Sequence, residues 1–351
     1  MTAAKKKNSR RKQARFRSSR RKRIRNTVLL LLLLVVLGGT GIGAIYVLRN
    51  GTVFDKLEDA YVASREFSGG ITDLDILRAD GFAKNLCVVV SDVPMDGVSL
   101  GENQKGLLLD LDDRKVLYSK QALQKVYPAS ITKIMTAMLA LKYGNMDDVV
   151  TITQENLNLE EGSQVCGFWA GDQVTMDQLL HCLLVYSGND AAAAIAEHVG
   201  GSTDGFVEMM NSYARELGCT GTHFTNPHGL QDENHYTTPY DIYLMLKEAL
   251  NYPEFTQITQ SGSYTVEYTH ADGSSASTTL LATDHYLTGE ATPPKNVTIL
   301  GGKTGTTDNA GNCLALLSQN AYGKPYISIV MGASTKDELY EQMSSLLQNI
   351  N

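Results

Sequence analysis

A serine and a lysine three residues apart stand at the start of an apolar segment. These residues are Ser130 and Lys133. The run from Ile131 to Tyr143 contains neither Gly nor Pro, and Gly144 follows, so we predict a helix that ends there. Residues i and i+3 share one helical face, which places the Lys133 amine beside the Ser130 hydroxyl. A serine hydroxyl needs a nearby base to act as a nucleophile, and a lysine serves as one when burial or neighbouring cations lower its pKa. The spacing alone is common, so the interpretation depends on the rest of the chain.

The charge of the chain is divided unevenly along its length. Residues 1–26 hold thirteen of the 31 Lys and Arg residues and no Asp or Glu, which leaves 18 basic against 38 acidic side chains in residues 27–351. A nucleic-acid-binding domain usually carries its basic patch on the folded part of the chain. We therefore expect no nucleic acid as partner, and a nucleic-acid-binding basic tail stays open only as the weakest hypothesis.

Residues 27–48 form an uncharged, apolar run of 22 residues. That length spans the hydrocarbon core of a bilayer. The Lys and Arg excess on its N-terminal side predicts that residues 1–26 are a cytoplasmic tail. The residues after the span are then expected on the extracytoplasmic side of the cell membrane. A cleaved signal peptide is the alternative, but its apolar part is usually shorter, about 7–15 residues. We therefore predict a single transmembrane helix, a stalk over residues 49–85 and a folded domain over residues 86–351.

The pattern of the folded part predicts strands, then a helix cluster, then strands and a terminal helix. Strands are expected at residues 86–90, 106–111, 116–119, 298–305, 313–317 and 326–331, with a hairpin turn at residues 112–114. Helices are expected at residues 131–143, 176–185, from 190, 203–217, from 239, and from 336 to about 347, several of them with a threonine cap. Residues 251–298 are expected to be irregular and partly β. This order suits an α/β (α+β) fold in which helices cover both faces of one antiparallel sheet.

The five cysteines give no metal or disulfide pattern. Their number is odd and no C-x-x-C spacing occurs. Several lie in apolar runs, where a small buried thiol is the ordinary interpretation, so we predict no structural disulfide. The residues are Cys87, Cys166, Cys182, Cys219 and Cys313.

Three short motifs, far apart in the chain, follow one another in a recognisable order. The first opens the helix described above, the second lies in a break between two predicted helices, and the third lies on a predicted strand. Each is weak alone, but the three together are the signature of penicillin-binding proteins and class A β-lactamases. They are Ser130-x-x-Lys133, Ser187-Gly-Asn189 and Lys303-Thr-Gly305.

Over roughly residues 86–351 the chain resembles the low-molecular-weight D-alanyl-D-alanine carboxypeptidases, serine peptidases of family S11 that trim the peptide stems of peptidoglycan. The resemblance rests on the three motifs and on residues 187–192, 223–230, 235–241 and 301–307. It implies a DD-peptidase/β-lactamase-like fold with a five-stranded antiparallel sheet, and neither a cofactor nor a metal. It also implies peptidoglycan stem peptides and β-lactam inhibitors as partners, while residues 27–48 would contact the membrane.

The resemblance implies catalytic roles for three side chains. Ser130 would be the acylated nucleophile, and Lys133 would accept its proton. Ser187 would relay protons to the leaving D-alanine. The physical argument agrees, because splitting hydrolysis into two acyl-transfer steps lowers each barrier.

Five further residues would bind the substrate. Asn189 would position the lysine base and the substrate amide, while Lys303, Thr304 and Thr306 would bind the terminal carboxylate. A cationic Lys303 suits a carboxylate, and it would also lower the pKa of a neighbouring lysine. Gly305 would let an extended substrate backbone approach the strand edge. The backbone N–H groups of Ser130 and Thr306 would form an oxyanion hole.

Two other functions stay open. The first is a catalytically idle penicillin-binding module that senses the cell wall, and the intact catalytic set argues against it. Glu155 resembles the deacylating glutamate of class A β-lactamases, yet it precedes the second motif, whereas the β-lactamase glutamate follows it. We therefore disfavour a β-lactamase.

Three histidines lie close together at His223, His228 and His235. Their spacing matches no zinc pattern, and Pro227 interrupts the segment. We predict hydrogen-bonded loop histidines rather than a metal site.

Overall fold

The computed structural model describes residues 85–350 of the chain. The predicted cytoplasmic tail (1–26), transmembrane helix (27–48) and, but for its last residue, stalk (49–85) lie outside this part. Residues from Asn85 onward form one compact unit. Among residues 85–350, no helix combines the length and the apolar character needed to cross a bilayer.

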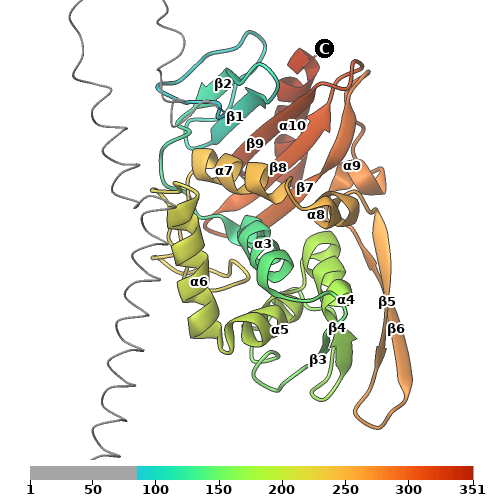
Figure 1. Ribbon diagram of the computed structural model, residues 1–351. Coiled ribbons are helices and arrows are strands. Elements are labelled where there is room, and N and C mark those ends of the chain that lie inside the picture. Colours follow the sequence, from blue (N-terminus) through green and yellow to red (C-terminus); the bar gives the residue numbers. More distant parts are fainter. Residues whose placement is uncertain (1–84, 351) are drawn as a thin grey trace, which may run out of the picture. The chain divides into compact units, whose positions relative to one another are not determined.

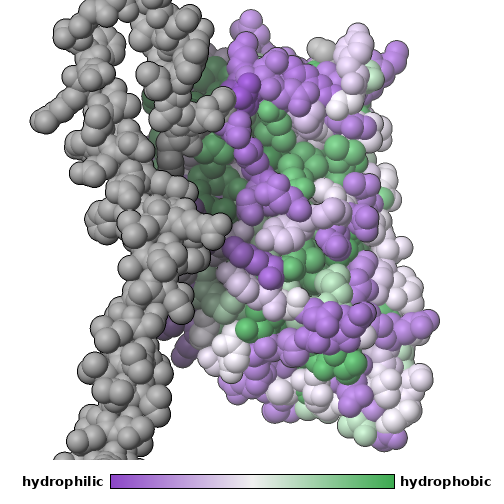
Figure 2. Space-filling view, in the orientation of Figure 1, coloured by the Kyte–Doolittle hydropathy of each residue, from purple (hydrophilic) through white to green (hydrophobic). Residues whose placement is uncertain are grey.

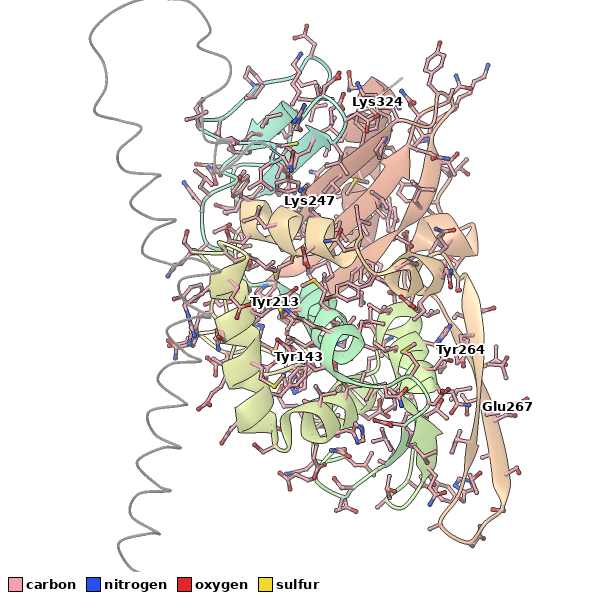
Figure 3. All side chains as sticks on the ribbon, viewed as in Figure 1. Tyr143, Tyr213, Lys247, Tyr264, Glu267 and Lys324 are labelled. Carbon is pink, nitrogen blue, oxygen red and sulfur yellow. The ribbon has the colours of Figure 1, made fainter. Side chains whose placement is uncertain are left out.

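A five-stranded antiparallel sheet with the order β2-β1-β9-β8-β7 organises this unit (Figure 1). The hairpin of the first two strands pairs with the last strand, with Gly106 opposite Val330, so both ends of the domain complete one sheet. At the β8–β9 turn, Lys324 lies 2.6 Å from carboxylate oxygens of Asp110 and Asp113 (Figure 3). The strands are β1 (Lys105–Asp110), β2 (Lys115–Lys120), β7 (Thr298–Thr307), β8 (Gly311–Gln319) and β9 (Pro325–Ala333).

Both faces of the sheet are covered, as predicted. Side chains alternate across a strand, so Leu107 and Leu109 face one apolar cluster while Leu108 faces the other. Helix α10 (Lys336–Leu347) covers the Leu108 face, and α3 (Lys133–Tyr143) and α7 (Pro239–Ala249) lie on the opposite face (Figure 1). The sheet therefore positions β7 and the start of α3 next to each other.

The predicted strand at residues 86–90 is wrong. These residues are extended but form no strand, and the edge of β2 is bridged only further on, between Val93 and Ser119. The backbone N–H of Cys87 donates instead to the Tyr243 hydroxyl of α7, at 2.9 Å. The alternation in this run is explained by burial of Cys87 and Val89 in the apolar core, not by strand pairing.

The helix cluster confirms the predictions from capping residues. Thr175 forms both halves of a capping box with Gln178, and Thr238 accepts a hydrogen bond from the N–H of Asp241 at the start of α7. Helix α3 is buried along residues 133–140 and packs against the alanine-rich α5. The remaining helices of the cluster are α4 (Met176–His181), continued by a π-helical turn (Cys182–Tyr186), α5 (Asn189–Gly200) and α6 (Thr203–Glu216).

The segment expected to be irregular contains more regular structure than predicted. Two short helices flank a long hairpin, which joins two other short strands in a second sheet of order β3-β4-β5-β6. Serine and threonine dominate β6, so its strand pattern is weak in sequence. Tyr264 of β5 stacks on His181 of α4, with ring centroids 4.0 Å apart (Figure 3). The elements are β3 (Val149–Thr151), β4 (Gln173–Thr175), α8 (Pro253–Thr259), β5 (Ser263–Thr269), β6 (Ser275–Leu281) and α9 (His285–Thr288).

All five cysteines are buried free thiols, which confirms the interpretation of their apolar surroundings. On the face drawn in Figure 2, hydrophilic and apolar residues interleave over the described part of the chain. Large exposed apolar side chains such as Val90, Trp169 and Tyr322 come from separate segments of the chain.

Replacing Thr335 by Ala tests the cap of α10, the helix on the Leu108 face. The Thr335 hydroxyl accepts from the Glu338 N–H at 3.1 Å, and loss of such a cap costs about 0.5–2 kcal/mol. We expect the free energy of unfolding in urea to fall by that amount. Thr335→Ser, which keeps the hydroxyl, should lose much less; equal losses in both variants would contradict the capping role.

Candidate active site

A strained turn places Ser130 at the start of α3. A 3-10 turn, Ala129–Thr132, precedes the helix, and Ala129 has the left-handed φ of 48°. A non-glycine residue in this region costs about 1–3 kcal/mol and persists only where its surroundings hold it. Thr132 provides part of that support, because its buried hydroxyl donates to the Ala129 carbonyl at 2.8 Å. The Ser130 side chain is left partly exposed.

Lys133 is completely buried beneath this serine. Its Nζ atom lies 2.9 Å from Ser130 Oγ, 2.7 Å from Asn189 Oδ1 and 2.8 Å from the carbonyl oxygen of His228. The last two atoms can only accept a hydrogen bond. A neutral amine has two N–H bonds and one lone pair, so with both N–H groups on these acceptors the lone pair points toward the serine hydroxyl.

The electrostatic surroundings favour that neutral amine. Burial lowers the pKa of Lys133 well below its usual range, and the positive charge of Lys303 lowers it further. Cys166 and Asp190 oppose this shift with smaller contributions. The arrangement therefore holds a serine hydroxyl against a base that is able to take its proton.

The loop of residues 226–235 packs against the Ala129–Thr132 turn. Gly229 has a φ of 90°, and a Cβ atom there would lie 1.8 Å from the Ala129 carbonyl oxygen. Asn226 shapes the loop by accepting the Gly229 N–H at 2.7 Å. The loop thereby brings the His228 carbonyl to the lysine, a contact that no sequence motif indicated.

The three histidines are hydrogen-bonded loop residues, as predicted. His235 Nδ1 accepts the Thr225 N–H at 3.0 Å, and its other nitrogen lies 2.8 Å from the Thr132 hydroxyl. Burial lowers the pKa of His235 to about 4 and that of His228 to about 3, so both rings are neutral at pH 7. His223 Nδ1 lies 2.7 Å from a backbone carbonyl oxygen.

The second motif sits where the π-helical turn ends and α5 begins. Ser187 has a left-handed φ of 72°, which redirects the chain so that Asn189 starts the next helix. Gly188 leaves room for Cys166, since a Cβ there would lie 2.3 Å from the Cys166 sulfur. The buried Asp190 carboxylate accepts the Cys166 N–H at 2.8 Å and holds this contact together.

Strand β7 brings the third motif against the serine turn. A Cβ at Gly305 would lie 2.9 Å from the Ser130 nitrogen, so only glycine allows this approach without displacement. Thr304 shares a 2.5 Å hydrogen bond with the Thr283 hydroxyl. The Lys303 side chain lies on the opposite face of the strand from the Thr304 side chain and is 1% exposed. Its ammonium donates to the Thr304 carbonyl oxygen at 3.1 Å. Burial lowers its pKa to about 7, although Asp284 raises it.

One cleft collects six of the eight predicted site residues, while the two lysines lie beneath it. Ser130, Ser187 and Asn189 line it together with Thr304, Gly305 and Thr306. Other lining residues were missed because they belong to no motif and come from distant segments, among them Gln164, Thr283, Asn312, Lys336 and Tyr340. Glu155 is exposed and does not line the cleft, which removes the feature that resembled a β-lactamase.

A family model described as D-alanyl-D-alanine carboxypeptidase, Peptidase_S11, matches residues 101–335. The chain belongs to this family. D-alanyl-D-alanine carboxypeptidase DacF of Bacillus subtilis is 36% identical over 251 residues, and DacA of Haemophilus influenzae is 32% identical over 256. Each match covers 70% of this chain and 61% of the relative's length.

Solved structures agree with membership of the D-alanyl-D-alanine carboxypeptidase family. The Streptomyces K15 DD-transpeptidase superposes with a TM-score of 0.65 at 27% identity, covering 74% of this chain and 98% of its own. A D-alanyl-D-alanine carboxypeptidase of Mycobacterium tuberculosis has a TM-score of 0.63 at 28% identity, covering 73% and 92%. The fold is therefore the DD-transpeptidase-like α/β fold with antiparallel sheets and flanking helices.

Gly229→Ala tests the packing of the loop on the serine turn, with Gly201→Ala as its matched control. Both glycines have positive φ, which costs alanine about 1–2 kcal/mol, but an added Cβ meets nothing within 4 Å at Gly201. The clash with Ala129 should add about 1–3 kcal/mol to the loss of unfolding free energy at Gly229. Equal losses in urea denaturation would show that the loop does not support the turn.

Proposed function

We propose that the chain is a serine-type D-Ala-D-Ala carboxypeptidase that removes the terminal D-alanine from peptidoglycan stem pentapeptides. The observation that carries the proposal is the buried Lys133 amine, 2.9 Å from the Ser130 hydroxyl and anchored by two acceptors. Membership of the family supports this chemistry. The names of the matched relatives, carboxypeptidases of several bacteria, support the substrate class.

In the first half-reaction, Ser130 Oγ attacks the carbonyl carbon of the penultimate D-alanine. The Ser130 hydroxyl proton passes to Lys133 Nζ. The oxyanion that forms on the attacked carbonyl is stabilised by the backbone N–H groups of Ser130 and Thr306. Collapse of this intermediate breaks the peptide C–N bond. Ser187 relays this proton from Lys133 Nζ to the departing amine, so free D-alanine leaves, Lys133 is neutral again and an ester on Ser130 remains.

In the second half-reaction, water replaces the departed D-alanine. Lys133 takes a proton from the water as its oxygen attacks the ester carbonyl. The ester C–O bond breaks, the proton returns to Ser130 Oγ, and the shortened stem peptide leaves as a carboxylic acid. No other co-reactant is required for the balance.

Substrate recognition follows from the edge of β7. An extended stem peptide runs along the strand, where Gly305 permits close approach of backbone to backbone. Thr304 and Thr306 offer hydroxyls to the terminal carboxylate, and the Lys303 ammonium lies beneath them as its counter-charge. Asn189 positions the substrate amide from the opposite wall. A β-lactam antibiotic would acylate the same serine and remain as a long-lived ester.

The proposed location is outside the cytoplasm, anchored through residues 27–48 in the cell membrane with residues 1–26 on the cytoplasmic side. The 22-residue uncharged run and the basic residues before it support this placement. The wall peptides are then accessible to the domain after the stalk.

A catalytically idle module is the alternative, in which Ser130 reacts with β-lactams but turns over no peptide. One relative is a Pseudomonas aeruginosa D-alanyl-D-alanine endopeptidase, so cleavage of cross-links is also measured. Incubating purified residues 50–351 with a synthetic stem pentapeptide and with a cross-linked dimer distinguishes the activities. Release of free D-alanine from the pentapeptide supports the proposal; labelling by penicillin without that release overturns it.

Ser130→Ala removes the proposed nucleophile. We expect complete loss of covalent labelling by a fluorescent penicillin and loss of D-alanine release, because no ester is able to form. Ser345→Ala on α10 removes a half-buried serine hydroxyl that does not line the cleft and should leave both activities unchanged. Labelling that survives in Ser130→Ala would place the nucleophile elsewhere.

Lys133→Arg separates positive charge from proton transfer. Arginine is not deprotonated in proteins, so acylation should fall on the order of 10²- to 10⁴-fold, the range of general-base contributions. In the wild-type protein, acylation should increase as pH rises through the lowered pKa of Lys133, because only the neutral amine accepts a proton. Stopped-flow labelling across pH measures both, and an arginine variant with wild-type rates would exclude Lys133 as the base.

A further inference from the structure

Lys303 is a buried cation with few polar contacts. It is 1% exposed, and its ammonium donates to the carbonyl oxygen of the adjacent Thr304. Taking a charge out of water is costly unless an opposite charge lies nearby. The proposed reaction needs this ammonium charged, because it faces the substrate carboxylate from beneath the cleft.

Asp284 is a buried carboxylate in the segment between β6 and α9, and it belongs to none of the three motifs. The residue is 6% exposed. Its Oδ1 atom accepts the Tyr286 N–H at 3.0 Å and the Tyr340 hydroxyl at 3.2 Å. Its Oδ2 atom is buried and, among the described residues, has no hydrogen-bond partner. An unsatisfied buried oxygen of this kind requires an explanation.

Both charged groups line one small cavity under the cleft floor. Thr283 and Thr304 line it as well, and their hydroxyls, 2.5 Å apart, join the Asp284 segment to β7. The cavity is distinct from the main cleft but shares Thr283 and Thr304 with it. Asp284 lines this cavity and not the main cleft, whereas Thr283 and Thr304 line both.

The two lysines and this carboxylate interact in sequence. Asp284 raises the pKa of Lys303 against the larger lowering by burial, and Lys303 in turn lowers the pKa of Lys133. Burial raises the pKa of Asp284, while the N–H of Tyr286, the Tyr340 hydroxyl and the charges of His285 and Lys303 lower it. His285 stacks on Tyr340, and its ring nitrogen lies 3.3 Å from the mostly exposed Glu290 carboxylate.

We propose that Asp284 is a positioning residue for the reaction, the buried counter-charge that keeps the Lys303 ammonium protonated beneath the carboxylate-binding part of the cleft. The inference rests on the proposed function, since it concerns binding of the substrate carboxylate. Asp284 does not line the main cleft, and in this role it acts through Lys303. A neutral side chain at position 284 makes the ammonium lose its proton at lower pH.

Asp284→Asn is a nearly isosteric test. Asparagine caps helices as well as aspartate does, so the hydrogen bond to Tyr286 is kept while the charge is removed. We expect the alkaline limb of the pH profile of kcat/KM for D-alanine release to move down by about one pH unit. Above that limb, KM should rise several-fold while kcat changes less, because the lost interaction is with the substrate carboxylate.

Glu290→Gln is the matched control, since it removes a carboxylate just beyond the other end of α9 and does not line the cavity. Its pH profile should equal that of the wild-type protein. A shifted limb in Asp284→Asn alone supports the inference; an unshifted limb, even with a lowered melting temperature, reduces Asp284 to a helix cap and overturns it. If the asparagine variant does not fold, Asp284→Ser, also a good cap, carries the same test.

The wild-type measurement separates this inference from the proposed function. Failure of the wild-type protein to release D-alanine overturns the proposed function, and the inference with it. Normal wild-type release with identical wild-type and Asp284→Asn pH profiles overturns only the role of Asp284.

Discussion

One lysine amine, buried completely inside the domain, is the interaction on which the rest of the site depends. An ammonium in that position would cost several kcal/mol, which shifts the group toward its neutral form. Lys133 is accommodated because three polar atoms surround its nitrogen, and each comes from a different segment. The serine belongs to the same turn, Asn189 opens α5, and His228 lies on a loop. Packing these segments together therefore also sets the surroundings of the Lys133 amine.

Close approach of backbones makes this convergence possible. At Gly229 and Gly305 a Cβ atom would fall inside the contact distance of the turn that carries Ser130. Ala129 and Ser187 stay in left-handed conformations that an isolated chain would leave. The strain persists because the sheet is packed on both faces and β7 lies against the turn. The same rigidity holds Asp284 and Lys303 around one cavity below the cleft.

Local chemistry made the helices and the main sheet predictable. Thr175, Thr238 and Thr335 cap helices whose starts follow directly from their hydroxyls. The prediction failed where tertiary contacts replaced strand pairing, as at Cys87, whose N–H bonds to a tyrosine of α7. It was incomplete for β6, whose serine and threonine residues pair only because β5 lies beside them. The three motifs indicated which of their own residues would meet in one cleft. They did not indicate the contact of the His228 carbonyl with Lys133, nor the place of Asp284.

By itself, the sequence determined where most helices begin and end, which strands alternate, and which residues make up the three motifs. These properties depend on neighbouring residues and on periodicity, so they are present in the chain before it folds. Only the tertiary structure decided that the Lys133 amine is buried and held by Asn189 and the His228 carbonyl, that Lys303 lies beneath the cleft, and that Asp284 lines the same cavity as Lys303. The pKa of each group depends on burial and on charges from distant segments, and no spacing along the chain encodes those distances.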